Sequence, residues 1–214
     1  MEGVQIYYTL DGSDPDERSH FFITPVLLTE STELKAIAYH DECQPSAIVK
    51  MNFFKAQKVQ LKEAALVPMA HKNYPGDGVS SLTDHRKGSI DFKDGNWLGI
   101  AKEDIEIECI FLDTIELSSV TVSTISDPNS WIFPPVGLEI WATDGSDHFI
   151  KIGDLKIDVL KEMEKPNLQF YACTFVKRNT TQLKVRIKNT NTIPPWHLRA
   201  GKGTWLFVDE LIFE

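Results

Sequence analysis

Polar and apolar residues alternate along much of this chain with a period of two, which is typical of β-strands. In "QLKVRIKN", Leu183, Val185 and Ile187 fall on one face, and the basic residues between them fall on the other. β-Branched and aromatic residues recur in similar segments, which Gly, Pro, Asn and Asp separate. These segments are "QIYYTL", "ELKAIAYH", "SSVTVSTIS", "GLEIWATD", "QFYACTFVK" and "TWLFVDELIF". The pattern predicts an all-β protein.

Two stretches depart from this alternation. "DVLKEMEK" predicts a helical turn or a loop between strands. "KAQKVQLKEAALV" is rich in Ala, Lys and Glu, which suits a connecting segment. We therefore expect a small N-terminal unit over residues 1–56, a linker over residues 57–66 and a larger unit over residues 67–214.

Composition narrows the function. The chain has 214 residues, of which 42% are hydrophobic, so it can bury a core. The formal net charge of −9 disfavours binding to nucleic acid or anionic membranes, but neutral sugars stay open. No apolar run is long enough to span a bilayer, and the three cysteines lack zinc-site spacing. The first residues do not form a signal peptide, so any export signal is expected upstream of this fragment.

The first unit carries a specific turn sequence. "YYTLDGSDP" is followed by "TPVLLTESTELKAIAYH" and "PSAIV". Gly12 can supply a positive φ, and the side chains of Asp11 and Ser13 can bond to the local backbone. With these pieces the unit resembles the C-terminal, fibronectin-III-associated module of chitobiases and β-hexosaminidases. The resemblance implies a small immunoglobulin-like β-sandwich that acts as a spacer.

Four segments occur in order in the second unit. They are "GVSSLTDHRKGSIDFKDGNWLGI", "DIEIECIFLDTIELSSVTVSTISD", "WIFPPVGLEIWATDGSDHFIKIG" and "WLFVDELIFE". The unit thereby resembles a discoidin or coagulation-factor type C domain, a galactose-binding-like jelly-roll β-sandwich. The sequence has "TDH" where that pattern usually has Asp-Gly. Either His85 adopts the backbone geometry that the glycine serves, or the loop differs.

Both modules in tandem resemble the non-catalytic tail of exported β-N-acetylhexosaminidases of gut-type bacteria. The resemblance implies a periplasmic, outer-membrane-attached or extracellular protein with a catalytic domain upstream in the same chain. We expect the second unit to bind glycans weakly, of the N-acetylglucosamine or galactose type. The alternative is a purely structural module that braces the catalytic domain. Binding by an exposed aromatic residue separates the two interpretations.

Asp209 and Glu210 are adjacent, as are the catalytic acids of family-related hexosaminidases. In a regular strand, successive side chains point to opposite faces. Asp209 would then face one way and Glu210 the other, so that they could not grip one glycosidic bond. A catalytic barrel would also need about 250 residues and alternating helices. We therefore expect no catalytic site in this chain.

The resemblance implies a structural calcium ion where an early loop meets the last strand. Calcium prefers oxygen ligands, both carboxylates and backbone carbonyls. The loop would be "SLTDHRKGS", and Glu210 would close the site. The alternative is that Asp84 caps a turn and Glu210 forms a salt bridge or is exposed. The expected ligands are Leu82, Asp84, Ser89 and Glu210.

Sugar sites pair an aromatic face with polar groups that reach the hydroxyls. Trp97 and Trp205 lie among apolar strand residues and are expected in the core. Trp131 in "DPNSWIFPP" and Trp196 in "IPPWHLRAG" are the candidate stacking residues, although Trp131 also suits a core position. The expected polar partners are His197, His85, Arg86 and Asn189, with Asn129 and Arg199 as further candidates.

Overall fold

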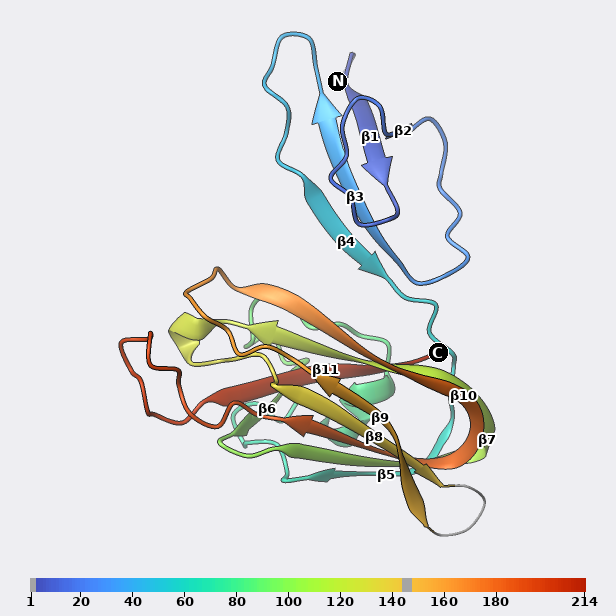
Figure 1. Cartoon of the computed structure of the whole chain (residues 1–214), viewed down its shortest axis with the longest axis vertical. Helices are drawn as coiled ribbons and strands as arrows, with labels where there is room; N and C mark the ends of the chain where they lie inside the picture. Colours follow the sequence, from blue (N-terminus) through green and yellow to red (C-terminus); the bar gives the residue numbers. More distant parts are fainter. Residues whose placement is uncertain (1–2, 144–147) are drawn as a thin grey trace. The chain divides into compact units, whose positions relative to one another are not determined.

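The computed structural model describes residues 3–143 and 148–214. The chain divides into two compact units, Met1–Ala56 and Gln57–Glu214 (Figure 1). Apart from two short 3-10 helices, the regular structure of the described residues is β-strand, so the prediction of an all-β protein is confirmed. Among these residues, no helix has the length and apolar character needed to cross a membrane.

The first unit contains a four-stranded antiparallel sheet in the order β2-β1-β3-β4. The turn after β1 forms as the sequence predicts: Gly12 has φ +82°, and the backbone N–H and hydroxyl of Ser13 donate to Asp11 Oδ1 at 3.0 and 2.6 Å. The strands are β1 (Gln5–Thr9), β2 (His20–Phe21), β3 (Thr32–Tyr39) and β4 (Val49–Phe53).

The second unit is a sandwich built on two long antiparallel strands of 22 residues each, β7 (Ile105–Ser126) and β10 (Asn167–Lys188). The remaining strands pair with different halves of these two. β11 (Trp205–Phe213) pairs with the C-terminal half of β7, and β6 (Leu98–Ala101) extends that layer. β5 (Leu61–Val67) pairs with the N-terminal half of β7.

The opposite layer is completed by β8 (Gly137–Thr143) on the C-terminal half of β10 and by β9 (Phe149–Lys156) on β8. Because the halves of β7 and β10 have different neighbours, both strands pass from one layer into the other where they curve (Figure 1). Register shifts in β10 on both sides of Arg178 and Thr180 accompany this bend.

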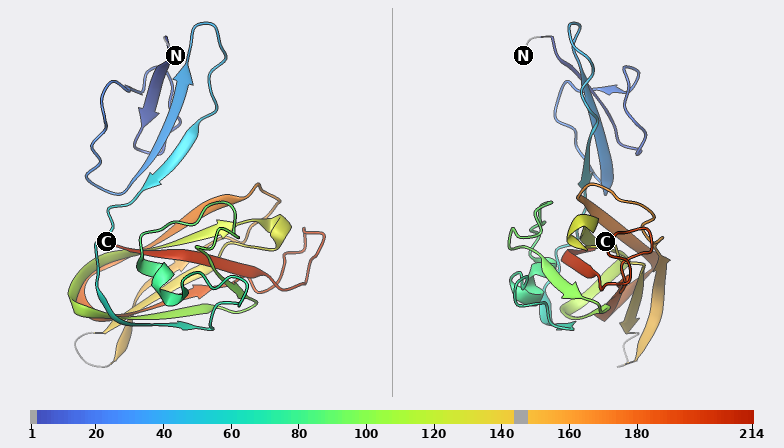
Figure 2. Two further views of the ribbon diagram at one scale, coloured as in Figure 1. Left: turned by 180° about the vertical axis from the view of Figure 1, so that it is seen from behind. Right: turned by 90° about the vertical axis from the view of Figure 1, so that its left-hand side faces the viewer.

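The main core lies between the layers and consists of alternate aliphatic and aromatic side chains. β11 is also buried on its other face, where a smaller aromatic cluster forms around Trp97, which is 1% exposed, and Phe207. The predicted core position of Trp97 is confirmed, and Trp205 packs half-buried against the same cluster. The 3-10 helix η1 (Gly78–Thr83) lies beside β11 (Figure 2).

The predicted linker is wrong for residues 61–66, because they belong to β5. Leu61 and Leu66 turn toward the core, while Lys62 and Glu63 face solvent. Gln57 is also held, since its backbone N–H donates to the carbonyl of Phe213 at 2.7 Å. Ala, Lys and Glu suggested a connection, but charged outward-facing residues are equally usual on an edge strand. The "DVLKEMEK" segment is a loop without helix.

Candidate functional site

An aromatic cleft of about 360 Å³ lies at one end of the second unit. The loops that follow β7, β9 and β10 form it. Trp131, Trp196 and His197, which were predicted as sugar contacts, are brought together here. Its lining consists of Asn129, Trp131, Met163, Trp196, His197, Leu198 and Arg199.

Trp131 is placed by a short 3-10 helix, η2 (Pro128–Ser130). It ends that helix in the left-handed conformation, at φ +64°, and its N–H donates to the carbonyl of Pro128 at 3.0 Å. Its own carbonyl accepts a hydrogen bond from the N–H of Trp205 at 2.8 Å. The backbone is therefore fixed to β11, while 38% of the residue stays exposed. Trp131 is a surface residue of the cleft and not a core residue.

Trp196 is half-buried, and its orientation is fixed by neighbours on two loops. Its indole Nε1–H donates to the carbonyl of Leu160 at 2.7 Å. The ring also lies 6.1 Å from the ring of Phe133 and 5.6 Å, edge to face, from that of His197. Because the indole N–H is already used, Trp196 can offer a ligand ring surface but not a hydrogen bond.

His197 and Arg199 supply the polar edge. The backbone N–H of Arg199 donates to His197 Nδ1 at 3.0 Å. In the neutral imidazole the proton is then on Nε2, which leaves a donor for a ligand. The backbone N–H of His197 donates to the carbonyl of Pro194 at 3.1 Å, so this segment is tied into a turn. Rigid loops of this kind lower the ordering cost of binding.

Three predicted sugar contacts lie outside the cleft. His85 and Arg86 belong to the loop after η1, and they do not line it. Asn189 is 3% exposed, so its prediction is wrong. Its amide oxygen accepts from the hydroxyl of Thr204, and its amide nitrogen donates to the carbonyl of Glu103. An asparagine in a strand-to-loop sequence gave no sign of this structural role.

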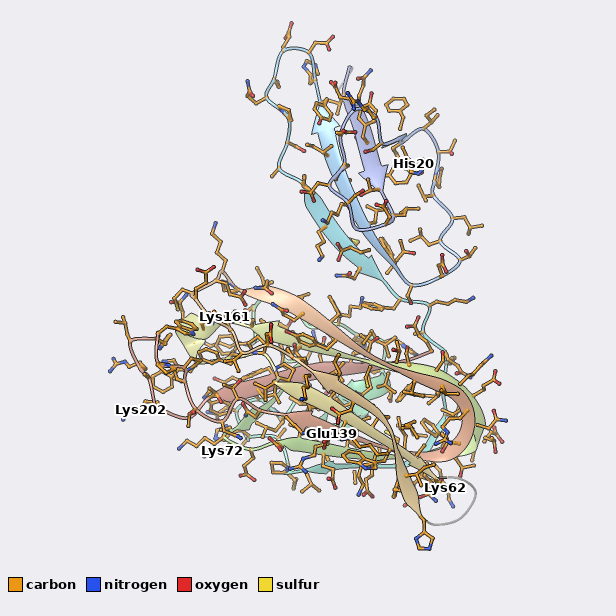
Figure 3. All side chains as sticks on the ribbon, viewed as in Figure 1. His20, Lys62, Lys72, Glu139, Lys161 and Lys202 are labelled. Atoms are coloured by element: carbon orange, nitrogen blue, oxygen red, sulfur yellow. The ribbon has the colours of Figure 1, made fainter. Side chains whose placement is uncertain are left out.

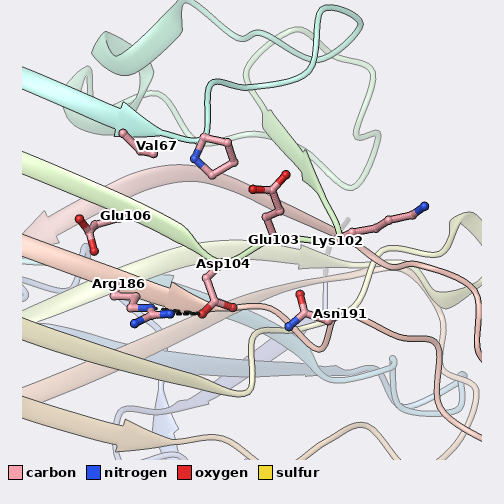
Figure 4. Close-up of a pocket in the computed structure, with 8 residues that line it drawn as sticks. Val67, Lys102, Glu103, Asp104, Glu106, Arg186 and Asn191 are labelled. Carbon is pink, nitrogen blue, oxygen red and sulfur yellow. Dashed lines mark hydrogen bonds and ion pairs between the residues drawn. The ribbon is translucent and has the colours of Figure 1, made fainter.

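Asn189 instead supports a charged hollow of about 460 Å³ beside β7 and β10 (Figure 4). Its backbone N–H donates to Asp104 Oδ1 at 3.0 Å, and Arg186 donates to Asp104 Oδ2 through Nε and Nη2 at 3.2 and 2.9 Å. The hollow is larger than the aromatic cleft, but it has no aromatic lining residue. Its central ion pair is satisfied within the protein.

Sequence reasoning missed Met163 and Leu198 in the aromatic cleft. Leu198 is 100% exposed and Met163 is 47% exposed. A leucine inside the polar loop "WHLRAG" and a methionine inside "KEMEK" are the available signals, because neither sits in an alternating strand pattern. Both residues add apolar surface for the C–H groups of a ligand.

The adjacent acids near the C-terminus lie at an irregularity of β11. Val208 pairs with Thr124 and Glu210 pairs with Ser123, so Asp209 is one extra residue in the strand. This β-bulge breaks the alternation of side chains. The prediction that the two acids face opposite ways assumed a regular strand.

Core membership shows how the faces change at the bulge. The residues of β11 in the main core are Leu206 and Val208 before it, and Leu211 and Phe213 after it. Asp209 and Glu210 therefore share the face that points away from the main core, and the prediction of opposite faces is wrong. However, they are 0% and 2% exposed. In this conformation neither carboxylate can contact a glycosidic bond.

The loop Asp84–Gly88 covers these acids. The backbone N–H of Gly88 donates to Asp209 Oδ2 at 2.5 Å, and His85 Nδ1 lies 3.8 Å from Glu210 Oε1. His85 has φ +61°, so it adopts the left-handed conformation in which glycine is usual. The side chain of Asp84 accepts from the backbone N–H of Arg86 at 2.8 Å.

Burial raises the pKa of Glu210 to about 8, with further contributions from the charges of Asp84 and Asp209. The His85 backbone and Lys87 act in the opposite direction. Burial also raises the pKa of Asp209, against the hydrogen bonds of Ser123 and Gly88. The local acidic charge is thus only partly balanced by the basic residues of the loop.

The expected calcium ligands differ in how well their surroundings suit a cation. Both carboxylate oxygens of Glu210 are buried and, among the described residues, accept no hydrogen bond of ordinary length, as a cation ligand would not; His85 Nδ1 stays at 3.8 Å from Oε1. Asp84 is close enough to raise the Glu210 pKa. Ser89 is exposed and its hydroxyl accepts from the N–H of Asp91 at 3.2 Å, while Leu82 is buried and offers only its carbonyl.

In the described part of the chain, no group of three or more His, Cys, Asp or Glu side chains is arranged to hold a metal ion. A cation here would therefore need backbone carbonyls besides Glu210 and Asp84. That donor set suits calcium, which takes carbonyl oxygens readily, better than zinc.

In comparison with known proteins, residues 1–53 match the family described as Fn3 associated. No curated protein matches the chain. Several solved structures resemble it, all at low identity. The family 32 carbohydrate-binding module of Streptococcus pneumoniae EndoD shares 8% identity over 73% of this chain and 97% of its own, with a TM-score of 0.47.

CpGH89CBM32-5 of Clostridium perfringens, solved in complex with GalNAc-β-1,3-galactose, shares 13% identity over 71% of this chain and 93% of its own, with a TM-score of 0.45. A chitosan-binding module of a chitosanase/glucanase from Paenibacillus sp. IK-5 shares 10% identity over 73% of this chain and 96% of its own, also with a TM-score of 0.45. The candidate site therefore rests on the geometry of this chain alone.

Proposed function

We propose that the second unit binds carbohydrate in the aromatic cleft between Trp131 and Trp196. The observation that carries this proposal is the juxtaposition of two tryptophans, from loops far apart in the sequence, with the free polar edge of His197. Aromatic faces stack on the apolar C–H face of a sugar, and a few polar groups orient its hydroxyls. Both tryptophans are held by backbone or indole hydrogen bonds before any ligand arrives.

The ligand class that we propose is a terminal sugar of the N-acetylglucosamine or galactose type, bound weakly. Seven residues line the cleft, so the contact area is small. We further propose that the chain is the accessory region of an exported β-N-acetylhexosaminidase-like hydrolase. In that setting it holds glycans near an upstream catalytic domain and performs no hydrolysis.

Calorimetric titration of the full chain with N-acetylglucosamine, chitobiose and methyl β-galactoside tests this proposal. We expect binding by at least one of them with a Kd on the order of 1 mM. Trp131→Ala removes a stacking face and weakens this binding at least about tenfold. Trp141→Ala is the control, since Trp141 lies on β8 outside the cleft. The proposal is wrong if no sugar binds, or if both variants bind as the wild type does.

We also propose that a structural calcium ion links the Asp84–Gly88 loop to β11. The buried carboxylate of Glu210 supports this, since its neighbour His85 Nδ1 is as far as 3.8 Å away, together with the nearby charge of Asp84. Calcium would tie the loop to the strand through oxygen ligands, and its role would be stability and not chemistry.

A second candidate function is docking on the upstream catalytic region through the first unit. One face of its sheet forms an apolar hollow of about 390 Å³, and Phe22 and Phe53 there are 44% and 40% exposed. Large exposed apolar patches mark interaction sites. Hydrogen exchange of β1, β3 and β4, measured with and without the separately produced upstream region, tests it. Unchanged exchange contradicts docking.

A further inference from the structure

The charges of the aromatic cleft differ from those of the chain as a whole. The chain has a net charge of −9, yet none of the seven lining residues is acidic. The lining contains one guanidinium, that of Arg199, and one imidazole, that of His197. A neutral sugar needs both donors and acceptors for its hydroxyls. This lining supplies mainly donors, with Asn129 as the only side-chain carbonyl.

The Arg199 guanidinium is available to a ligand. The residue is exposed, and within the described ranges 3–143 and 148–214 its side chain forms no ion pair. Its backbone is nevertheless fixed at both ends: its N–H donates to His197 Nδ1 at 3.0 Å and its carbonyl accepts from the N–H of Lys202 at 3.2 Å. A fixed backbone with an unpaired cationic head group is suited to receive an anion.

Basic and acidic residues both occur around the cleft. Lys161 follows Leu160, whose carbonyl holds the Trp196 indole, and Lys202 bonds back to Arg199. Both lysines lie at the end of the unit where these loops run (Figure 3). Glu162 and Glu164 flank Met163 in the same loop, but neither lines the cleft.

We infer that the cleft selects sugars that carry a carboxylate, such as uronic or sialic acids, over their neutral counterparts. The inference rests on the proposed sugar binding at the same site and specifies its ligand. The Arg199 guanidinium has a planar fork of donors that matches a carboxylate. His197 Nε2–H is a second donor on the same wall. Trp131 and Trp196 hold the apolar face of the ring.

Two pairs of ligands, each with one acidic and one neutral member, test the inference. Methyl β-galacturonide differs from methyl β-galactoside only at C6, and 3′-sialyllactose differs from lactose by its acidic sugar. Calorimetric titration of the full chain in 20 mM and in 150 mM NaCl compares them. We expect at least one acidic ligand to bind about tenfold more tightly than its neutral partner, less so at high salt. The acidic ligand that shows the preference identifies the sugar class.

Arg199→Gln removes the guanidinium while keeping a polar side chain. We expect it to abolish the preference for the acidic ligand, because it lowers the affinity for the acidic ligand more than the affinity for its neutral partner. Arg18→Gln, an exposed arginine of the first unit, is the control for net charge and leaves the preference unchanged. Equal binding of acidic and neutral sugars overturns this inference and leaves the proposed function standing. Absence of binding by every sugar overturns both.

Discussion

At the scale of single residues, Glu210 is the group whose observed environment differs most from the one that the sequence predicts. An acid in the last strand suggested a surface residue or a metal ligand, and the structure buries it at 2% exposure, with no hydrogen bond of ordinary length from the described residues. Burial and two neighbouring acids raise its pKa from 4.5 to about 8. The folded state therefore binds a proton on Glu210 more tightly than the unfolded state does.

The first prediction concerns stability against pH in EDTA. Because the folded pKa is raised, the contribution of Glu210 is fully present below about pH 4.5 and is lost as the pH rises through about 8. Within this window each pH unit costs up to about 1.4 kcal/mol. We expect the free energy of unfolding, from urea titrations, to fall between pH 5 and 8.5. Glu210→Gln should flatten this dependence and stabilise the protein at pH 8.

The second prediction adds calcium to the same measurement. An ion beside Glu210 favours the ionised carboxylate, so calcium should raise the Tm of the wild type at pH 8 by several degrees. Glu210→Gln should lose most of that increase. Ser89→Ala is the comparison, since its exposed hydroxyl already accepts from Asp91 and its loss should matter little. If the Tm of the wild type is the same in calcium and in EDTA, the proposed ion is contradicted.

At the scale of elements, the bulge in β11 decides which side chains meet. Periodicity alone predicted the strand and its apolar character, but the alternation changes phase at Asp209. The local sequence does not predict the extra residue of the bulge, because "VDEL" is equally compatible with a regular strand. Pairing with β7 fixes it, and pairing partners are distant in sequence. β5 was not predicted for the same reason, because its role as an edge strand depends on its pairing with β7.

The third prediction tests the bulge by deletion. Removing Asp209 restores a one-to-one register and keeps Leu206, Val208, Leu211 and Phe213 on the core face. We expect this variant to fold, with a loss of about 1–3 kcal/mol from the bond that Gly88 makes to Asp209. An alanine inserted between Leu206 and Phe207 instead reverses side chains before the bulge and should prevent folding. Circular dichroism and urea unfolding distinguish the two.

At the scale of the whole molecule, the alternating pattern predicted the all-β class and the core position of Trp97, and the aromatic content of the loops pointed to Trp131 and Trp196. Asn189, Met163 and Leu198 were assigned wrongly or missed, because loop residues follow no period and their roles depend on which loops meet. The prediction also failed where the amino-acid composition of a strand resembles that of a linker. The Ala- and Lys-rich stretch of β5 resembled a linker, although its leucines point into the sandwich.

The last prediction distinguishes two possible N-terminal boundaries of the second unit, residue 57 and residue 67. A chain of residues 57–214 retains β5 and the bond from Gln57 to Phe213, whereas residues 67–214 lack both. Without β5, the backbone of β7 from Glu106 to Phe111 loses its pairing on one edge, and the core loses Leu61 and Leu66. Burial of each leucine contributes about 1.5–3 kcal/mol, so the shorter chain should melt at least about 10 °C lower by calorimetry, or aggregate through its bare edge. Equal melting temperatures would mean that residues 57–66 are a linker after all, and that β5 contributes nothing to the sandwich.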